Sequence, residues 1–240
     1  MVTSSGGRAR REREREEMRH RITQAARHLF VTEGYASTTI RRIADAIEYT
    51  PGAIYSYFAD KDAIFYALHQ QGFFELQQRF VAAIGAGGNP AAQLRRVGEA
   101  YLAFARDNPE MYHLMFIAQA TSRSVDKADA WPEGKAAYET IRALVQVAVT
   151  SGWIRPADPD VVAFALWSAA HGAVALEICH RQAVLPLDRR AMLTDHAFAY
   201  VLRSILTERP RVTPPGDARV PERSPEVAMI PRGRRGVKER

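Results

Sequence analysis

The stretch Thr38–Lys61 contains two short amphipathic segments separated by only a few residues, and this spacing restricts the folds that the chain can adopt. In the first segment, apolar residues recur three or four positions apart, at Ile40, Ile43, Ala44 and Ile47, which predicts a helix with one buried face. Thr38 precedes this helix as its expected N-cap. Thr50-Pro51 opens the second segment with a capping threonine and a proline at the first helical position. Two short helices joined by a tight turn form the unit that places its second helix in the major groove of DNA.

Positive charge at the helix starts indicates an external anion. Arg41 and Arg42 lie in the first turn of the first helix, and Lys61 opens the helix that follows the pair; the helix dipole disfavours cations at these places. DNA phosphate would supply the missing negative charge, and nearby hydroxyl groups would donate hydrogen bonds to it. Gly52 would let the backbone approach the duplex closely. The hydroxyl-bearing residues are Thr38, Thr50, Tyr55, Ser56 and Tyr57.

The same stretch resembles the helix-turn-helix signature of the TetR/AcrR family of transcriptional regulators. The resemblance covers about residues 21–68 and is carried by Gly34-Tyr35, Thr38-Thr39, Ile43-Ala44, Thr50-Pro51-Gly52, Ile54-Tyr55, Tyr57-Phe58 and Lys61. It departs from the common pattern at Ile47-Glu48, where Ala-Gly is usual, so the turn lacks glycine at a position that often has a positive φ. The second half of the chain resembles the WHG ligand-binding domain at Asn108-Pro109-Glu110-Met111-Tyr112, Trp167 and His171-Gly172.

The resemblance and the placement of these groups together predict the DNA-binding residues. We expect phosphate contacts from Thr38, Arg42, Tyr57 and Lys61, and base contacts from Pro51, Ala53 or Tyr55. The predicted set is completed by Thr39, Thr50, Gly52 and Ser56. The expected partner is a palindromic double-stranded operator, bound by the two recognition helices of a dimer.

Hydrophobic periodicity and composition divide the chain into four segments. Residues 1–17 are polar and lack apolar periodicity, so we expect a disordered arm of interleaved basic and acidic residues. Residues 18–65 form the helix-turn-helix domain, and residues 66–207 form an effector-binding and dimerisation domain of helices, which makes the fold class all-α. A helix from Lys61 to about Ile84 joins the two domains. Residues 208–240 hold six of the 13 prolines and nine basic residues, which predicts a disordered basic tail.

Aromatic and polarizable residues in the second domain suit a small-molecule site, because such sites have apolar walls and few polar atoms. The candidates are Tyr101, Tyr112, Met115, Phe116, Trp131, Tyr138, Trp167 and His171. Any single one of them is also compatible with an ordinary core position. The resemblance to a family that binds small effectors in this domain favours the functional interpretation for the group, with an unknown effector.

The helix expected at about residues 159–179 is apolar almost all round. Such a helix needs cover on every side, and a second copy of the chain is the natural cover. Small residues at Ala165, Ser168, Ala169, Gly172 and Ala173 would permit close helix packing. We therefore expect a homodimer formed through this helix and the last one, at about residues 188–207.

Catalytic and membrane functions have little support in the sequence. The seven histidines show no metal-binding spacing, and neither a Walker sequence nor a GxSxG sequence is present; no cofactor, metal site or catalytic residue is predicted. The single cysteine, Cys179, fits a reducing cytoplasm, and we expect no apolar run of membrane-spanning length. The resemblance implies a cytoplasmic, dimeric repressor released from its operator by a hydrophobic or aromatic effector. The alternatives are an effector-binding protein that has lost DNA recognition and an all-helical enzyme.

Overall fold

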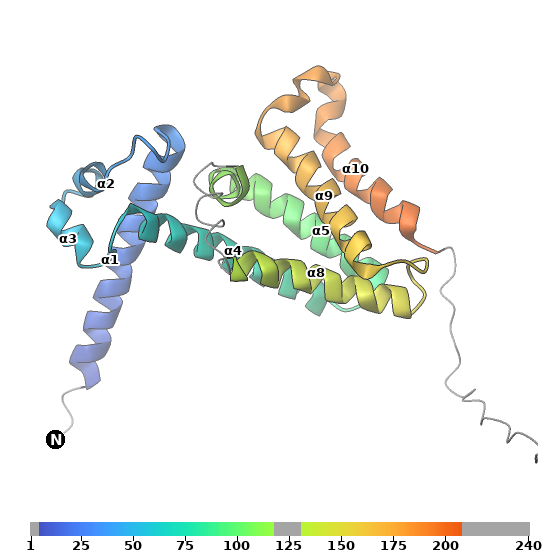
Figure 1. Cartoon of the computed structure of the whole chain (residues 1–240), viewed down its shortest axis with the longest axis horizontal. Coiled ribbons are helices and arrows are strands. Elements are labelled where there is room, and N and C mark those ends of the chain that lie inside the picture. Colours follow the sequence, from blue (N-terminus) through green and yellow to red (C-terminus); the bar gives the residue numbers. More distant parts are fainter. Residues whose placement is uncertain (1–4, 118–130, 208–240) are drawn as a thin grey trace, which may run out of the picture.

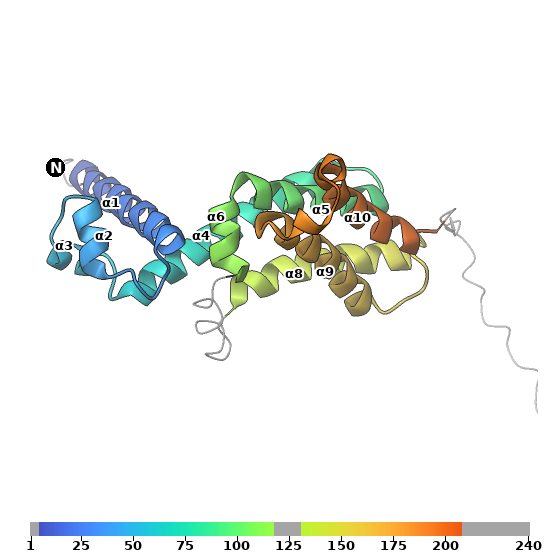
Figure 2. The ribbon, with the colours of Figure 1, turned by 90° about the horizontal axis from the view of Figure 1, so that it is seen from above.

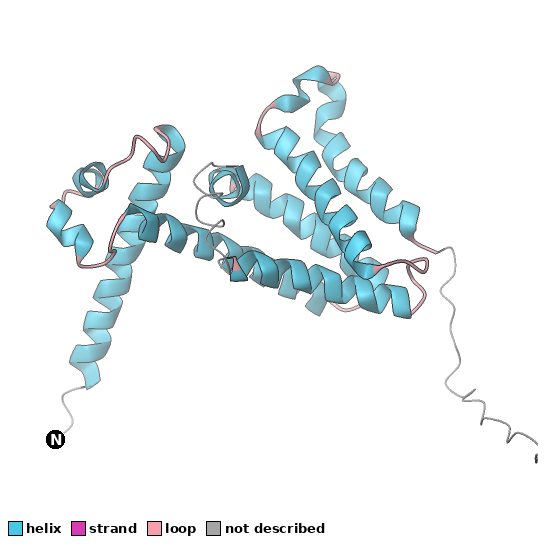
Figure 3. Ribbon diagram, viewed as in Figure 1, coloured by secondary structure: helices cyan, strands magenta, loops and turns pink. Residues whose placement is uncertain are grey.

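Every regular element in the described parts of the chain is a helix (Figure 3). The computed structural model describes residues 5–117 and 131–207. Its elements are α1 (Ser5–Thr32), α2 (Ile40–Ala46), α3 (Pro51–Tyr55), α4 (Lys61–Gly85), α5 (Pro90–Asp107), α6 (Pro109–Tyr112), η1 (His113–Ile117), α8 (Pro132–Thr150), α9 (Pro159–Ile178), η2 (Arg181–Val184), η3 (Leu187–Arg189) and α10 (Arg190–Ile205). Figures 1 and 2 show α1 to α3 grouped at one end, with α4 running from this group into the larger bundle. The predicted all-α class is confirmed.

Helix α1 begins at Ser5, which differs from the disordered arm expected over residues 1–17. Arginine and glutamate are both good helix formers, and opposite charges four residues apart attract one another along a helix. Arg10 and Glu14 form such a pair, with 3.5 Å between Nε and Oε1. The sequence analysis relied on apolar periodicity, which a run of alternating arginine and glutamate does not have. Residues 1–4 and the predicted tail at 208–240 lie outside the described residues.

A threonine caps α2, but it is Thr39 and not the expected Thr38. The Thr39 hydroxyl accepts a hydrogen bond from the Arg42 amide at 3.2 Å. Thr38 is fully buried, and its hydroxyl donates to the Gly34 carbonyl at 2.9 Å. Thr38 therefore stabilises the loop before α2 from inside the domain.

The start of α3 follows the prediction. Thr50 accepts a hydrogen bond from the Ala53 amide at 3.3 Å, and Pro51 occupies the first turn. Between α2 and α3, Glu48 has a φ of 61°, so this turn does require the left-handed conformation that usually selects glycine. The chain makes the family turn with a residue that is strained there.

Helix α4 belongs to both halves of the molecule. Asp60 caps it by accepting from the Ala63 amide at 2.7 Å. Near its start, α4 buries residues against α1, and further along it buries residues against α5 and α8. The residues buried along its length are Ile64, Phe65, Leu68, His69, Gly72, Phe73, Leu76 and Phe80. One continuous helix thus contributes to the cores of both halves.

Helices α5, α8, α9 and α10 form the bundle around the second half of α4 (Figure 1). At the contact of α5 with α10, a side chain at Gly98 would collide with the Phe198 ring, so only glycine allows this approach. Arg106 of α5 joins Glu177 of α9 through Nε and Asp195 of α10 through Nη1, each at 2.9 Å. These contacts fix the α9–α10 pair to the bundle.

Helix α9 corrects the expectation that the chain has no apolar run of membrane-spanning length. Its 20 residues have a mean hydropathy of 1.6 over the most apolar window, so it is long and apolar enough to cross a membrane by length and composition. The core helix of a helical domain has the same properties, and α9 packs against α5, α8 and α10.

Candidate DNA-binding and effector sites

Helix α3 buries one face and leaves the other free. Ile54 is buried in the domain core, whereas Tyr55 is 56% exposed and Ser56 is exposed beside it. A side chain built at Gly52 would meet only the Thr50 Oγ1 atom, at 3.9 Å. The free face thus combines hydroxyl groups with an open approach to the backbone. Of the predicted base-contacting residues, Tyr55 is fully on this face, and Pro51 and Ala53 are half-buried.

Positive charge flanks this face from α2. Arg41 and Arg42 are both exposed, next to the exposed Thr39. The guanidinium of Arg42 lies 2.5 Å from the Glu33 carboxylate, while more than half of its side chain stays accessible. Arg41 forms no ion pair with any residue that the structure describes. Unlike Arg42, Arg41 has no carboxylate partner among the described residues, so it is a candidate for a phosphate contact, although the predicted set omitted it.

Lys61 has a structural role that the sequence analysis missed. Its Nζ atom donates to the carbonyls of Tyr35 and Thr38, at 2.7 Å and 2.8 Å, and lies 4.2 Å from the centre of the Tyr35 ring. Partial burial lowers the pKa of Lys61. An ammonium group has three donors, so one is left for a phosphate. For Thr38 the expected phosphate contact conflicts with full burial of the side chain.

Two arginines of α1 contact the residues on either side of α3. Arg19 donates to the Tyr57 carbonyl at 2.7 Å, and its guanidinium lies 4.2 Å from the centre of the Phe58 ring. Arg21 lies over the Tyr49 ring at 5.3 Å. The side chain of Tyr57 is half-buried. These supporting contacts join residues about 30 to 40 positions apart, and no local pattern in the sequence indicates them.

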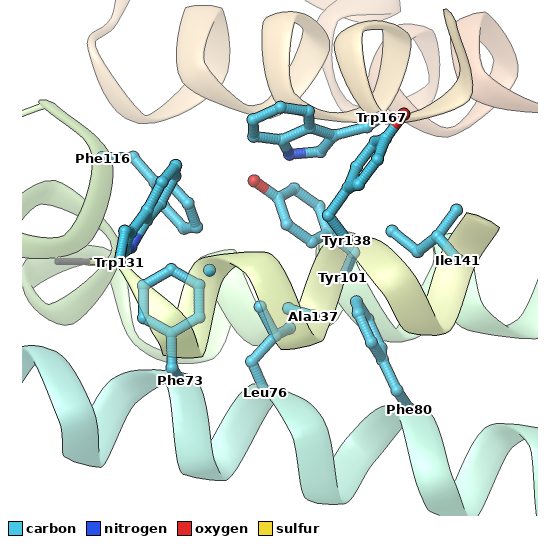
Figure 4. A pocket seen from close by; sticks show the side chains of 11 residues that line it. Phe73, Leu76, Phe80, Tyr101, Phe116, Trp131, Ala137, Tyr138, Ile141 and Trp167 are labelled. Carbon is cyan, nitrogen blue, oxygen red and sulfur yellow. The ribbon is translucent and has the colours of Figure 1, made fainter. Parts of the chain in front are cut away.

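Two adjoining cavities lie among α4, α5, α8 and α9 (Figure 4). The first has a cavity volume of about 20 Å³ and is lined by Phe73, Leu76, Phe80, Tyr101, Phe116, Trp131, Gly134, Ala137, Tyr138, Ile141 and Trp167. The second also has a volume of about 20 Å³ and is lined by Phe80, Leu94, Val97, Gly98, Tyr101, Ile141, Leu166, Trp167, Ala170 and Phe198. They meet at Phe80, Tyr101, Ile141 and Trp167. No lining residue is charged, so the combined site suits an apolar molecule.

Five of the eight predicted effector residues line the first cavity, namely Tyr101, Phe116, Trp131, Tyr138 and Trp167. Met115 does not; it is fully buried and packs against Gly72 of α4. The predicted set lacks the lining residues of α4, where Phe73, Leu76 and Phe80 point into the cavity and form its floor (Figure 4). Their spacing of three and four residues was visible, but it also fits an ordinary core stripe.

The remaining predicted pair, Tyr112 and His171, stands behind the wall of the cavity. The hydroxyls of Tyr101 and Tyr112 lie 2.9 Å and 2.8 Å from His171 Nδ1, and the side chain of Trp167 hydrogen-bonds to Tyr101. Burial raises the pKa of both tyrosines and lowers the pKa of His171. The group is therefore neutral near physiological pH, and Tyr101 is its only hydroxyl on the cavity wall.

A second polar group lies near the Trp131 end of the cavity. His69 is 5% exposed and packs against Phe73, at 4.9 Å between ring centres. Neither of its ring nitrogens has a hydrogen bond of good geometry in the part of the chain that the structure describes, although the Met115 backbone lies close. Burial lowers the pKa of His69. Glu133 is a neighbour of His69. Burial alone would raise the pKa of Glu133, but hydrogen bonds from Gln70 and Tyr66 lower this pKa by more, so Glu133 is an ionised carboxylate.

One ion pair connects α1 to the effector domain. Arg27 Nε lies 3.1 Å from Glu110 Oε2 of α6. Helix α6 continues directly into η1, a π-helix that carries Phe116 to the cavity wall. The π-helix is a strained form often found at functional sites. A short series of contacts through η1 and α6 thus connects the cavity wall to α1.

Large apolar side chains are exposed along α9, α10 and the segment between them. Phe164 and Leu176 of α9 are 58% and 53% exposed. The others are Val161, Val184, Leu187, Met192 and Tyr200. The described residues contain no group of three or more histidines, cysteines or acidic residues that could hold a metal ion.

Two family descriptions match this chain. Residues 22–68 match "Bacterial regulatory proteins, tetR family", and residues 94–200 match "Tetracyclin repressor-like, C-terminal domain". The first match contains the C-terminal part of α1, α2, α3 and the start of α4, and the second contains most of the cavity wall. The narrower resemblance to WHG-type domains stays a prediction.

Characterised relatives carry names of transcriptional regulators. The chain is 27% identical over 157 residues to the HTH-type transcriptional regulator HbdR of Aromatoleum sp. (strain CIB), a match that covers 65% of this chain and 68% of that protein. It is 43% identical over 53 residues to an HTH-type transcriptional repressor of Mycobacterium tuberculosis. The second match spans only 22% of this chain and 28% of that repressor.

Solved structures of similar shape are also regulators. A bacterial regulatory protein in the tetR family from Rhodococcus RHA1 superimposes with a TM-score of 0.66 at 22% identity, over 80% of this chain and 98% of the other. The ketosteroid transcriptional regulator KstR2 of Mycobacterium tuberculosis gives 0.61 at 19% identity, over 80% and 96%. At this level of identity the likenesses show the fold.

Proposed function

Because this chain belongs to the TetR family of bacterial regulatory proteins, whose members bind operator DNA as dimers, we propose that it is a repressor that a small hydrophobic or aromatic effector releases from a palindromic operator. It is a DNA-binding transcriptional regulator and not an enzyme. The finer parts of the proposal are the contacts with DNA, the effector, the dimer interface and the sign of regulation. A cytoplasmic location goes with DNA binding.

The observation that carries the proposal is the free face of α3 beside the cations of α2. Tyr55, Ser56 and the open approach at Gly52 would meet the base edges and sugar-phosphate backbone of the major groove. Arg41, Arg42 and Thr39 would contact phosphates, because they are exposed at the adjacent helix start. We retain a secondary phosphate contact for Lys61 through its third N–H donor, and drop the Thr38 side chain from the set.

The dimer would form through α9 and α10. Exposed apolar side chains gather on these two helices, which are otherwise fixed to the bundle by Arg106. Burial of this surface against a second copy would remove it from water. A two-fold axis would then present two recognition helices about 34–36 Å apart, the distance between successive major grooves on one face of DNA.

Release would follow from linkage between the two sites. An effector that binds more tightly to a conformation with misplaced recognition helices must weaken operator binding by the same factor. Filling the cavity would press on α4, which supplies its floor, and on η1, which supplies Phe116. Both elements lead to the DNA-binding domain, directly through α4 or through the Arg27–Glu110 pair.

A pair of matched glycine variants tests the DNA-binding face. Gly52→Leu places a side chain in the open approach of α3, and Gly85→Leu places the same side chain at an equally open position at the far end of α4. DNase footprinting on the DNA that flanks the gene should show two protected half-sites for the wild type and for Gly85→Leu, and none for Gly52→Leu. Equal protection by all three would refute the assigned face.

A further inference from the structure

The hydrogen-bonding group behind the cavity indicates the chemical class of the effector. Tyr101 is 4% exposed, its hydroxyl points into the space between Trp167, Phe116 and Trp131 (Figure 4), and it lines both cavities. Every other lining residue is apolar or aromatic, apart from Tyr138. The Tyr138 hydroxyl donates to the Asp160 carbonyl at 3.2 Å, and the indole N–H of Trp131 is buried without a hydrogen-bond partner among the described residues. Tyr138 and Trp131 line the first cavity alone, whereas Tyr101 lines both, so Tyr101 offers a polar anchor to a molecule that extends between them.

The partners of Tyr101 let it act as a donor or as an acceptor. A neutral imidazole whose proton is on Nε2 has one lone pair on Nδ1, and the hydroxyls of both Tyr101 and Tyr112 lie within 2.9 Å of His171 Nδ1. If Tyr112 donates to His171, the Tyr101 proton is free for a ligand oxygen. If Tyr101 donates instead, its oxygen accepts from a ligand hydroxyl. The first arrangement suits a ligand carbonyl or hydroxyl group, and the second suits a ligand hydroxyl group.

Charge excludes an anion from the same place. No lysine or arginine lines either cavity, so an ionised carboxylate would be buried without a counter-charge. A negative charge stands near the Trp131 end, because Glu133 is an ionised carboxylate held by Tyr66 and Gln70. Glu133 lies two residues after Trp131, in the first turn of α8.

We infer that the effector proposed for this cavity is a neutral aromatic or alicyclic molecule whose hydroxyl or carbonyl oxygen bonds to the Tyr101 hydroxyl, and that molecules with an ionised carboxylate are rejected. This rests on the effector role assigned to the cavity above. The two adjoining cavities share Phe80, Ile141 and Trp167 as well as Tyr101. Each has a volume of only about 20 Å³, so a fused-ring molecule would extend from one into the other by displacing these side chains.

Three probes of matched shape test the inference by equilibrium dialysis against the full chain: 2-naphthol, 2-naphthoate and 2-methylnaphthalene. We expect 2-naphthol to bind at least about 10-fold more tightly than 2-naphthoate, since even a modest net cost of the buried charge exceeds about 1.4 kcal/mol. Tyr101→Phe should weaken 2-naphthol about 2- to 10-fold, the range for one hydrogen bond, and leave 2-methylnaphthalene unchanged. Tyr138→Phe is the control, because it removes a hydroxyl that the inference does not use.

The results separate this inference from the proposed function. Tighter binding of 2-naphthoate, an unchanged 2-naphthol preference in Tyr101→Phe, or failure of all three probes to bind would each overturn the ligand class. Specific operator binding, measured on the same preparations, would leave the regulator assignment standing in each case. Absence of specific operator binding together with the expected probe preferences would overturn the proposed function and leave the ligand class in place.

Discussion

The ammonium group of Lys61 joins the start of α4 to the loop before α2. It donates to two backbone carbonyls of that loop and stands over the Tyr35 ring, whose hydroxyl in turn hydrogen-bonds to Asp62. A cation in this place satisfies carbonyls that have no other partner among the hydrogen bonds described for the loop. The residue thus serves the fold of the DNA-binding domain first.

Replacing Lys61 by methionine should lower the free energy of unfolding by about 1–3 kcal/mol, because two buried carbonyls lose a charged donor. Urea unfolding followed by circular dichroism measures this. Arg41→Gln is the matched comparison: it should leave stability unchanged and lower operator affinity, with the salt slope reduced by about 1. Unchanged stability in Lys61→Met, with operator binding lost, would instead identify Lys61 as a phosphate ligand only.

Replacing Glu48 by glycine should raise the stability of the protein, since Glu48 has a φ of 61° and is not glycine. The left-handed conformation costs a residue with a side chain about 1–2 kcal/mol, whereas glycine loses about 0.4–1 kcal/mol through the flexibility of the unfolded chain. We therefore expect Glu48→Gly to raise stability by roughly 0.5–1 kcal/mol. Glu48→Val should lower it, because a β-branched residue is more strained there. A lower thermal midpoint for Glu48→Gly would contradict the assigned turn.

Acid should destabilise the protein partly through His69. Its pKa is lowered by burial, so between the folded and unfolded values the unfolded chain binds more protons. The resulting contribution is present above the unfolded pKa of about 6.5 and is lost as the pH falls toward the folded value. His69→Met should reduce the loss of the urea midpoint between about pH 7 and pH 5. An equal loss in both proteins would show that His69 does not titrate in this window.

The helices of the candidate DNA-binding face were easier to predict from the sequence than the lining of the cavities. Capping threonines, a first-turn proline and helical periodicity are local signals, and they located α3 and its exposed face. Cavity walls are assembled from several helices, so Phe73 and Leu76 could not be told from ordinary core residues until α8 and α9 were in place. The bonds of Lys61 to the Tyr35 and Thr38 carbonyls likewise join positions more than 20 residues apart.

At the scale of elements, α6 and η1 form a second link between α1 and the cavity, beside α4, against which both also pack. Helix α6 is only four residues long, begins without a side-chain cap and continues as a π-helix. Its Glu110 contacts α1 while Phe116 of η1 contacts the cavity. Asn108, which precedes α6, donates to Glu75 of α4 at 3.1 Å.

Breaking the Arg27–Glu110 pair should therefore affect induction more than DNA binding. Glu110→Gln should keep operator affinity within about 3-fold, since a partly exposed ion pair contributes about 0.2–1 kcal/mol, and should raise the effector concentration needed for release. Anisotropy of labelled operator, titrated with effector, measures both quantities. Glu99→Gln, which breaks the exposed Arg95–Glu99 pair within α5, is the comparison. Unaltered release in Glu110→Gln would remove α6 from the coupling path.

Element boundaries followed the capping signals closely. The starts of α4, α5, α8 and α9 lie where a cap or a proline predicts them. Two boundaries differ from the prediction for physical reasons. Thr39 and not Thr38 caps α2, because Thr38 is buried and bonded to the Gly34 carbonyl. The early turns of α1 carry the Arg10–Glu14 pair instead of an apolar face.

For the whole molecule, the account requires a dimer formed through α9 and α10. Phe164→Glu places a charge at the centre of the exposed apolar surface on α9 and should dissociate the dimer, with a dissociation constant raised at least about 10-fold. Phe74→Glu is the matched control, because Phe74 is 68% exposed on α4 and lies outside the proposed interface. Sedimentation equilibrium distinguishes them. A dimer that survives Phe164→Glu and dissociates in Phe74→Glu would move the interface to α4.

Specific operator binding is the central claim, and one titration tests it most directly. Fluorescence anisotropy of the purified chain is measured against labelled DNA that flanks its gene and against a scrambled duplex, at two salt concentrations. We expect the flanking DNA to bind at least about 10³-fold more tightly, the lower end of the range for specific sites. Equal affinities for both duplexes, falling together as salt rises, would show non-specific attraction of basic residues and would contradict the account.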